Sequence, residues 1–105
     1  MADHDAAVAD LWDAHMRAAF PNRLRGAEVA AVEMVILDAD VVGCVSAWLR
    51  NGGNIDGPHC GHLASCEEQL IRVIPELNGG EAAYYQRLLD MTALVLESLQ
   101  NPRSG

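Results

Sequence analysis

The fold depends on residues 27–53, AEVAAVEMVILDADVVGCVSAWLRNGG. β-Branched side chains crowd residues 29–45, so residues 32–37, VEMVIL, have the composition of a buried strand. A strand needs a partner to pair its amides, and no other segment of the chain looks extended. We therefore predict one long helix over about residues 26–50, with the choice between helix and strand left open for residues 31–37.

The other elements follow from helical periodicity and from prolines that end helices. An aspartate can cap a first helix that Pro21 ends, and apolar residues recur at helical spacing in the third and fourth segments. The fold class is therefore predicted to be all-α, an antiparallel four-helix bundle in a single domain. The predicted ranges are helices at about 5–20, 26–50, 62–76 and 80–99, a tail at 100–105, and one domain over 1–105.

The predicted second helix is apolar on nearly every side. Such a helix is either central in its own chain or also buried against a second subunit. The second possibility predicts a homodimer, with Val45, Trp48 and Leu49 as interaction residues.

The charge of the chain limits its partners. Fifteen acidic residues oppose seven basic ones, all of them arginine, and the formal net charge is −8. A nucleic-acid-binding protein needs a basic face, and these arginines are scattered, so we expect no nucleic-acid partner. An acidic surface instead suits a basic protein partner, as in an inhibitor or immunity-type protein.

The N-terminal sequence MADHDAAVADLWD has neither the basic region nor the apolar core of a secretory signal. The longest apolar stretches fall far short of the ~20 residues that span a bilayer, so no membrane association is expected. Three cysteines, an odd number, argue against a disulfide framework. We predict a cytoplasmic protein.

Residues 57–68, GPHCGHLASCEE, contain the densest cluster of potential metal ligands. His62 and Cys66 are four residues apart, which places both on one face of a helix. His59 would join them if the helix began at Pro58, since proline is favoured in a first turn. Imidazole and thiolate suit zinc or copper.

The same residues allow a structural interpretation. Ser65 and Glu68 have the spacing of a capping box, which would begin the helix at Ser65 and leave His62 in a loop. Cys66 falls on the apolar stripe, where a buried free thiol is ordinary.

Cys44 extends the metal hypothesis to the preceding helix. In an antiparallel hairpin Cys44 and Cys66 lie at similar distances from the turn, and Asp40 precedes Cys44 by four residues. Asp40, Cys44, His62 and Cys66 could therefore converge as a mixed ligand set or a redox pair. Alternatively, Cys44 is a small residue that lets two helices approach.

Asp38 and Asp40 interrupt the same apolar run, and an unpaired buried carboxylate is costly. The two aspartates could pair with an arginine, form a polar site inside the bundle, or lie on a narrow solvated strip. Their candidate arginine partners are Arg17, Arg72 and Arg87. His15 fits a packed histidine better than a general base, because no nucleophile lies near it in sequence.

The sequence contains no glycine-rich phosphate loop, no H-E-x-x-H and no G-x-S-x-G. Catalysis is therefore the least supported class. The leading prediction is protein–protein interaction or self-association. The alternatives are a metal-binding or thiol redox-sensing bundle that uses Cys44, His62 and Cys66, and an acidic inhibitor of a basic partner.

Two resemblances add to this picture. Residues 23–53, RLRGAEVAAVEMVILDADVVGCVSAWLRNGG, and residues 84–99, YYQRLLDMTALVLESL, resemble small uncharacterised helical proteins of high-GC bacteria. That resemblance implies a shared fold and no known activity. Residues 62–66, HLASC, are similar to the His-Leu-x-x-Cys element of helical copper-sensing repressors, in which both residues bind Cu(I). Those repressors are basic enough to hold DNA, whereas this chain is acidic.

Overall fold

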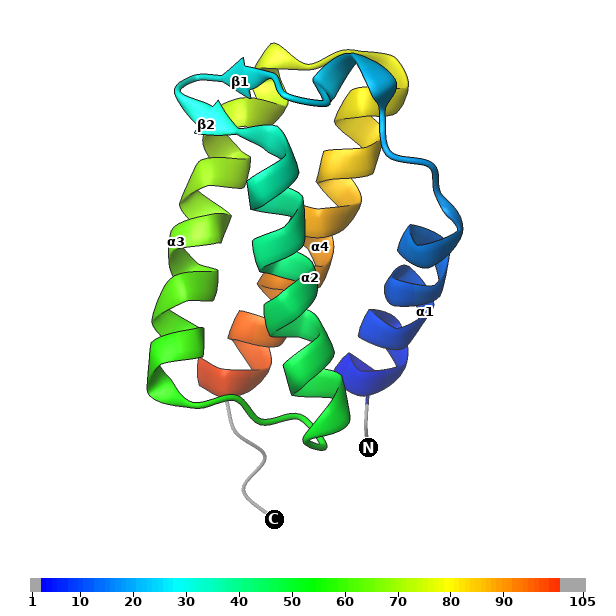
Figure 1. The fold of residues 1–105 in the computed structure, drawn as a ribbon. Coiled ribbons are helices and arrows are strands. Elements are labelled where there is room, and N and C mark those ends of the chain that lie inside the picture. The colour runs from blue at the N-terminus through cyan, green and yellow to red at the C-terminus, as the bar shows by residue number, and fades with distance from the viewer. Residues whose placement is uncertain (1–2, 101–105) are drawn as a thin grey trace.

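The computed structural model describes residues 3–100, and they form an all-α fold with one small hairpin (Figure 1). The all-α prediction is confirmed. In chain order the elements are α1 (Asp3–Arg17), the 3₁₀ turn η1 (Asn22–Leu24), β1 (Glu28–Val29), β2 (Val32–Glu33), α2 (Met34–Arg50), α3 (Gly57–Val73), the 3₁₀ turn η2 (Ile74–Glu76) and α4 (Gly79–Gln100).

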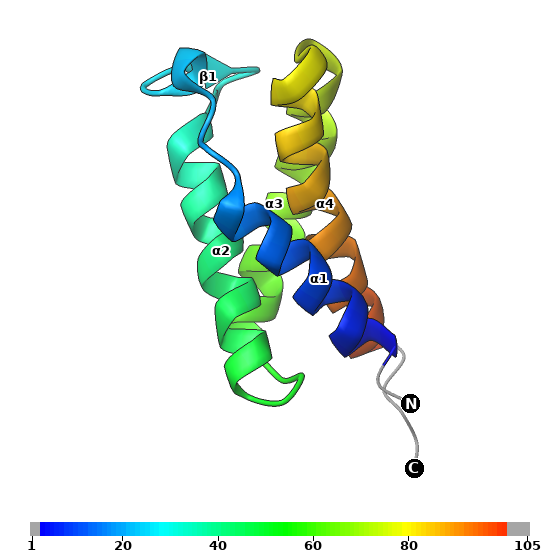
Figure 2. The same cartoon turned by 90° about the vertical axis from the view of Figure 1, so that its right-hand side faces the viewer.

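Successive helices run in opposite directions. Helices α2, α3 and α4 lie side by side, and α1 crosses them at an angle on the side that Figure 2 shows. Helix α4 packs against each of the other three. The apolar stripe predicted for it is buried as expected, through Tyr84, Leu88, Met91 and Val95. None of the described helices is long and apolar enough to cross a membrane.

The prediction of a helix beginning near residue 26 is wrong for its first two turns. Strands β1 and β2 pair antiparallel, with Val29 opposite Val32, and α2 begins only at Met34. The strand alternative is correct for Val32 and Glu33 and wrong beyond them. The physical reason is the turn between the strands, where Ala30 and Ala31 both have positive φ, at 50° and 65°. A two-residue turn of this kind gives the strand a partner from within the same segment.

Those two alanines predict a stabilising substitution. A left-handed conformation costs a residue with a Cβ about 1–2 kcal/mol, so Ala31→Gly should raise the free energy of unfolding by about 1 kcal/mol. Urea denaturation measures the change. The matched control is Ala39→Gly, because Ala39 is exposed in the middle of α2, where glycine should cost about 1 kcal/mol. Equal destabilisation by both substitutions would contradict the observed turn.

Helix α3 begins five residues before the predicted start at about residue 62. Asp56 caps it by accepting a hydrogen bond from the His59 amide at 2.9 Å, and Pro58 lies in its first turn. The capping box that would begin the helix at Ser65 is therefore wrong, and His62 is helical. Helix α3 ends at Val73, because Pro75 in η2 cannot continue the α-helical hydrogen bonds.

Two of the predicted interaction residues are part of the core. Trp48 is 1% exposed and Val45 is fully buried, while Leu49 is partly buried against the same core. Helix α2 contacts both α3 and α4, so much of its apolar surface is buried within one chain. The large apolar side chains of α2 that remain exposed are Val35 and Ile36.

Candidate metal centre between helices α2 and α3

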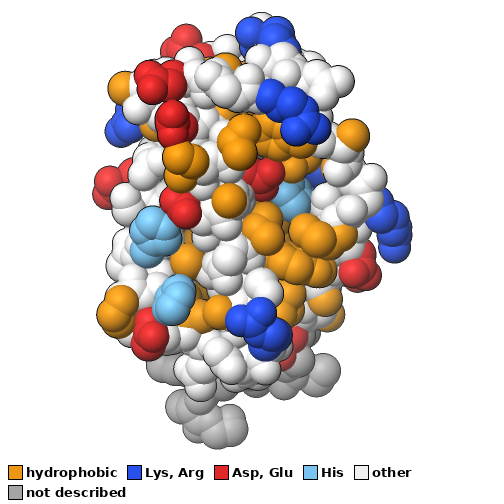
Figure 3. Space-filling view, in the orientation of Figure 1, with side chains coloured by type: hydrophobic (Ala, Val, Ile, Leu, Met, Phe, Trp, Pro, Cys, Tyr) orange, Lys and Arg blue, Asp and Glu red, His pale blue; other side chains and the backbone are white. Residues whose placement is uncertain are grey.

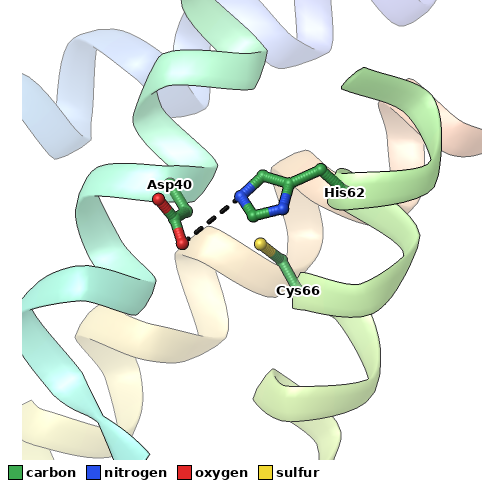
Figure 4. Close-up of side chains that lie close together, drawn as sticks. All are labelled: Asp40, His62 and Cys66. Carbon is green, nitrogen blue, oxygen red and sulfur yellow. Dashed lines mark ion pairs between the residues drawn. The ribbon is translucent and has the colours of Figure 1, made fainter. Parts of the chain in front are cut away.

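Three potential ligands from two helices meet midway along the α2–α3 hairpin. Asp40 comes from α2, and His62 and Cys66 come from α3 (Figure 4). One ligand atom from each residue lies within 4.8 Å of the other two. His62 Nε2 and Asp40 Oδ2 are 3.3 Å apart, and the Cys66 thiol points toward this pair.

The local structure explains this convergence. Because α3 begins at Gly57, His62 and Cys66 are one helical turn apart and project from the same face. The antiparallel pairing of α2 with α3 then brings Asp40 level with them. The triad contains three of the four residues in the set suggested from the sequence, and the fourth residue of that set is Cys44.

The three side chains differ in their access to solvent. The side chains of His62 and Asp40 are 50% and 37% exposed, whereas Cys66 is 1% exposed. Burial raises the pKa of the Cys66 thiol to about 12, and the nearby charges of Asp40 and Cys44 act in the same direction. The thiol is therefore protonated at neutral pH, and an ion that bound its sulfur would have to displace the proton.

The donor set fits zinc chemistry. Zinc accepts carboxylate oxygen, imidazole nitrogen and thiolate sulfur at ~2.0–2.3 Å, which places tetrahedral ligand atoms roughly 3.3–3.8 Å apart. The ligand atoms of the triad lie within 4.8 Å of one another, so each distance exceeds the tetrahedral spacing by no more than about 1 Å. Copper(I) would favour the imidazole and the thiolate over the carboxylate. Three protein ligands leave a fourth coordination position for water or another molecule.

The other two predicted ligands lie outside this triad. The His59 ring is half-exposed and bonds through Nδ1 to Asp56 Oδ1 at 2.7 Å, so the residue that caps α3 also holds this histidine. Cys44 is buried and its thiol donates to the His59 carbonyl oxygen at 3.8 Å. Its pKa is raised by burial and then by the charges of Asp40 and Asp56. Cys44, Cys60 and Cys66 are all free cysteines.

A second polar cluster joins α1, α2 and α4 through His15, Asp38 and Tyr84. Asp38 accepts a hydrogen bond from the Tyr84 hydroxyl at 2.8 Å, and its other oxygen lies 2.9 Å from His15 Nε2. Of the predicted alternatives for Asp38, the polar site between helices is observed, and no ion pair among residues 3–100 joins Asp38 to an arginine. His15 is 4% exposed, and its Nδ1 has no hydrogen-bond partner within the described part of the chain. The cue in the sequence is an aspartate inside an apolar run, whereas the helical spacing of Tyr84 and Leu88 indicates only core positions.

Comparisons of the chain with protein-family models, with curated proteins and with solved structures gave no match.

Proposed function

We propose that this chain binds a transition-metal ion, zinc or copper(I), between α2 and α3. The observation that carries the proposal is the meeting of Asp40, His62 and Cys66, three donors of the kinds that bind these metals, from two different helices. Two of the three side chains are substantially exposed, so an ion can reach the site from solvent. We also place the protein in the cytoplasm, where Cys66 stays reduced.

The direct test is titration with cobalt(II), a spectroscopic substitute for zinc, followed by competition with zinc. We expect one ion per chain, with a sulfur-to-cobalt charge-transfer band. Cys66→Ser should remove the band and weaken zinc binding by about 100-fold or more, because it deletes a direct ligand. Cys60→Ser is the matched control, since Cys60 lies on the same helix and outside the triad. Binding that is absent in the wild type, or unchanged in Cys66→Ser, would contradict the proposal.

A second candidate function is protein–protein interaction or self-association. Hydrophobic side chains gather between α1 and α2 on the face that Figure 3 shows. Met16, Val35 and Ile36 are exposed, and an open groove of about 370 Å³ is lined in part by Met16, Phe20 and Val35. Apolar side chains around a groove are typical of interaction sites.

Two partners are compatible with this second candidate. A second copy would give a homodimer, and light scattering across micromolar concentrations tests it, since a strictly monomeric mass contradicts self-association. The net charge of −8 instead favours a basic protein, as expected of an inhibitor or immunity-type protein. Capture of such a partner should weaken steeply as salt is added.

A further inference from the structure

A large open hollow lies away from the metal triad, between the end of α1 and the start of α4. Its volume is about 950 Å³. Figure 2 shows the two segments that border it, the connection that follows α1 and the first turns of α4. The polar side chains of its lining are Asn22, Arg23, Glu76, Asn78, Glu81 and Arg87, together with Tyr84.

Arg87 is the unusual member of this lining. Its Nη1 atom is buried and has no hydrogen-bond partner among residues 3–100. None of the ion pairs found in that range includes Arg87. A guanidinium carries its charge at any accessible pH, and a buried donor left without an acceptor is costly. Arg87 therefore carries a positive charge without an ion-pair partner in that range, and its Nη1 is a donor without an acceptor.

The neighbouring carboxylates do not meet that requirement. Glu81 accepts two hydrogen bonds from Arg23, at 2.7 and 2.6 Å, and this pairing lowers the pKa of Glu81. Asp38, which does not line the hollow, is bonded to both His15 and Tyr84. Glu76 also lines the hollow, but it forms no ion pair with Arg87. Arg23 and Glu81 neutralise each other, so the charge of Arg87 remains available.

The rest of the lining can complete an anion site. Asn22 and Asn78 offer side-chain amide donors, and the hollow includes Gly80 in the first turn of α4. The N-terminus of this 22-residue helix carries a partial positive charge. The volume is at the upper end of the range for small-molecule pockets, so it can hold a group larger than a bare ion.

We infer that this hollow binds a small anionic metabolite, whose carboxylate or phosphate group pairs with the Arg87 guanidinium. Arginine suits both groups because its planar nitrogens can bond two oxygens at once. The net charge of −8 opposes anions at long range, so we expect a modest affinity for the isolated group, with a Kd of about 1 mM.

The test is a titration of the ¹⁵N-labelled protein, followed by NMR, with inorganic phosphate in one arm and succinate in the other. We expect saturable shifts of the Arg87 side chain and of the Asn22 and Asn78 amides in at least one arm. The arm with the lower Kd identifies the preferred anionic group. Absence of saturable shifts with both anions would overturn the inference.

Variants of Arg87 separate a binding role from a structural one. Arg87→Gln should weaken anion binding at least tenfold, and Arg87→Lys should weaken it less because the charge is kept. Arg72→Gln is the control, since Arg72 is exposed on α3 and does not line the hollow. Circular dichroism checks that each variant is folded. If folded Arg87→Gln binds either anion as tightly as the wild type, the assignment of Arg87 is wrong.

Discussion

Replacing Trp48 by alanine is expected to lower the free energy of unfolding by about 3–5 kcal/mol. Trp48 is 1% exposed and is the largest of the fully buried side chains, so its removal leaves a cavity in the core. A domain of this size is typically stable by about 5–15 kcal/mol, so the loss is a large share of the total. Urea denaturation followed by far-ultraviolet circular dichroism measures it.

The matched control for Trp48 is Ile36→Ala on the same helix. Ile36 is 52% exposed, and its truncation should change stability by no more than about 0.5 kcal/mol in the monomer. The comparison distinguishes a core role from the interface role that the sequence suggested. If Trp48→Ala cost less than 1 kcal/mol and instead changed the mass of the protein in solution, Trp48 would belong to an interface.

Trp48 also illustrates the limit of prediction from this sequence. In helix α4 apolar residues recur every three or four positions, so its buried stripe through Leu88, Met91 and Val95 could be predicted. Helix α2 is apolar on nearly every side and has no clear inner face. Its rotation is set by contacts with α3 and α4, which are not visible in its own residues.

The β1–β2 hairpin could not be predicted because its turn lacks the usual turn residues. Turns with positive φ are usually marked by glycine, asparagine or aspartate, and here the turn is formed by Ala30 and Ala31. Alanine also favours helices, so local composition pointed to a helix that begins too early. The turn is evident in the structure from the antiparallel pairing of Val29 with Val32.

The candidate metal centre was predictable in part. The spacing of His62 and Cys66 identified one helical face, and the hairpin placed Asp40 opposite it. The sequence could not exclude Cys44 and His59 from the triad, because their positions depend on side-chain contacts. His59 is held by Asp56 at the start of α3, and the Cys44 thiol is directed to a backbone carbonyl.

Removing the Asp38 carboxylate is the second substitution with a large expected effect. Asp38→Ala should cost about 2–5 kcal/mol, because it leaves both the Tyr84 hydroxyl and His15 Nε2 without their acceptor. Asp38→Asn is the matched control, since it keeps the shape and one acceptor oxygen, and it should cost about 1–2 kcal/mol. Urea denaturation at neutral pH compares the two. A cost below 1 kcal/mol for Asp38→Ala would show that the cluster contributes little.

The pH dependence of stability gives an independent readout of the same cluster. Burial raises the pKa of the Tyr84 phenol above its usual value of 10.0, and the hydrogen bond and charge of Asp38 raise it further. The folded state therefore holds this proton more tightly than the unfolded state. Its contribution to stability is complete below pH 10 and is lost as the pH rises through the folded pKa.

Asp38→Asn should lower the Tyr84 pKa, because it removes the carboxylate charge that opposes ionisation of the phenol. Alkaline titration of phenolate absorbance should show one tyrosine ionising at lower pH than in the wild type. Tyr85 should respond less, since burial is the first cause of its raised pKa, the charge of Asp38 is the second, and its hydroxyl donates to the Met34 carbonyl oxygen rather than to Asp38. Identical titration curves for the two proteins would contradict a direct bond between Tyr84 and Asp38. A larger shift for Tyr84 than for Tyr85 would locate the hydrogen bond at Tyr84.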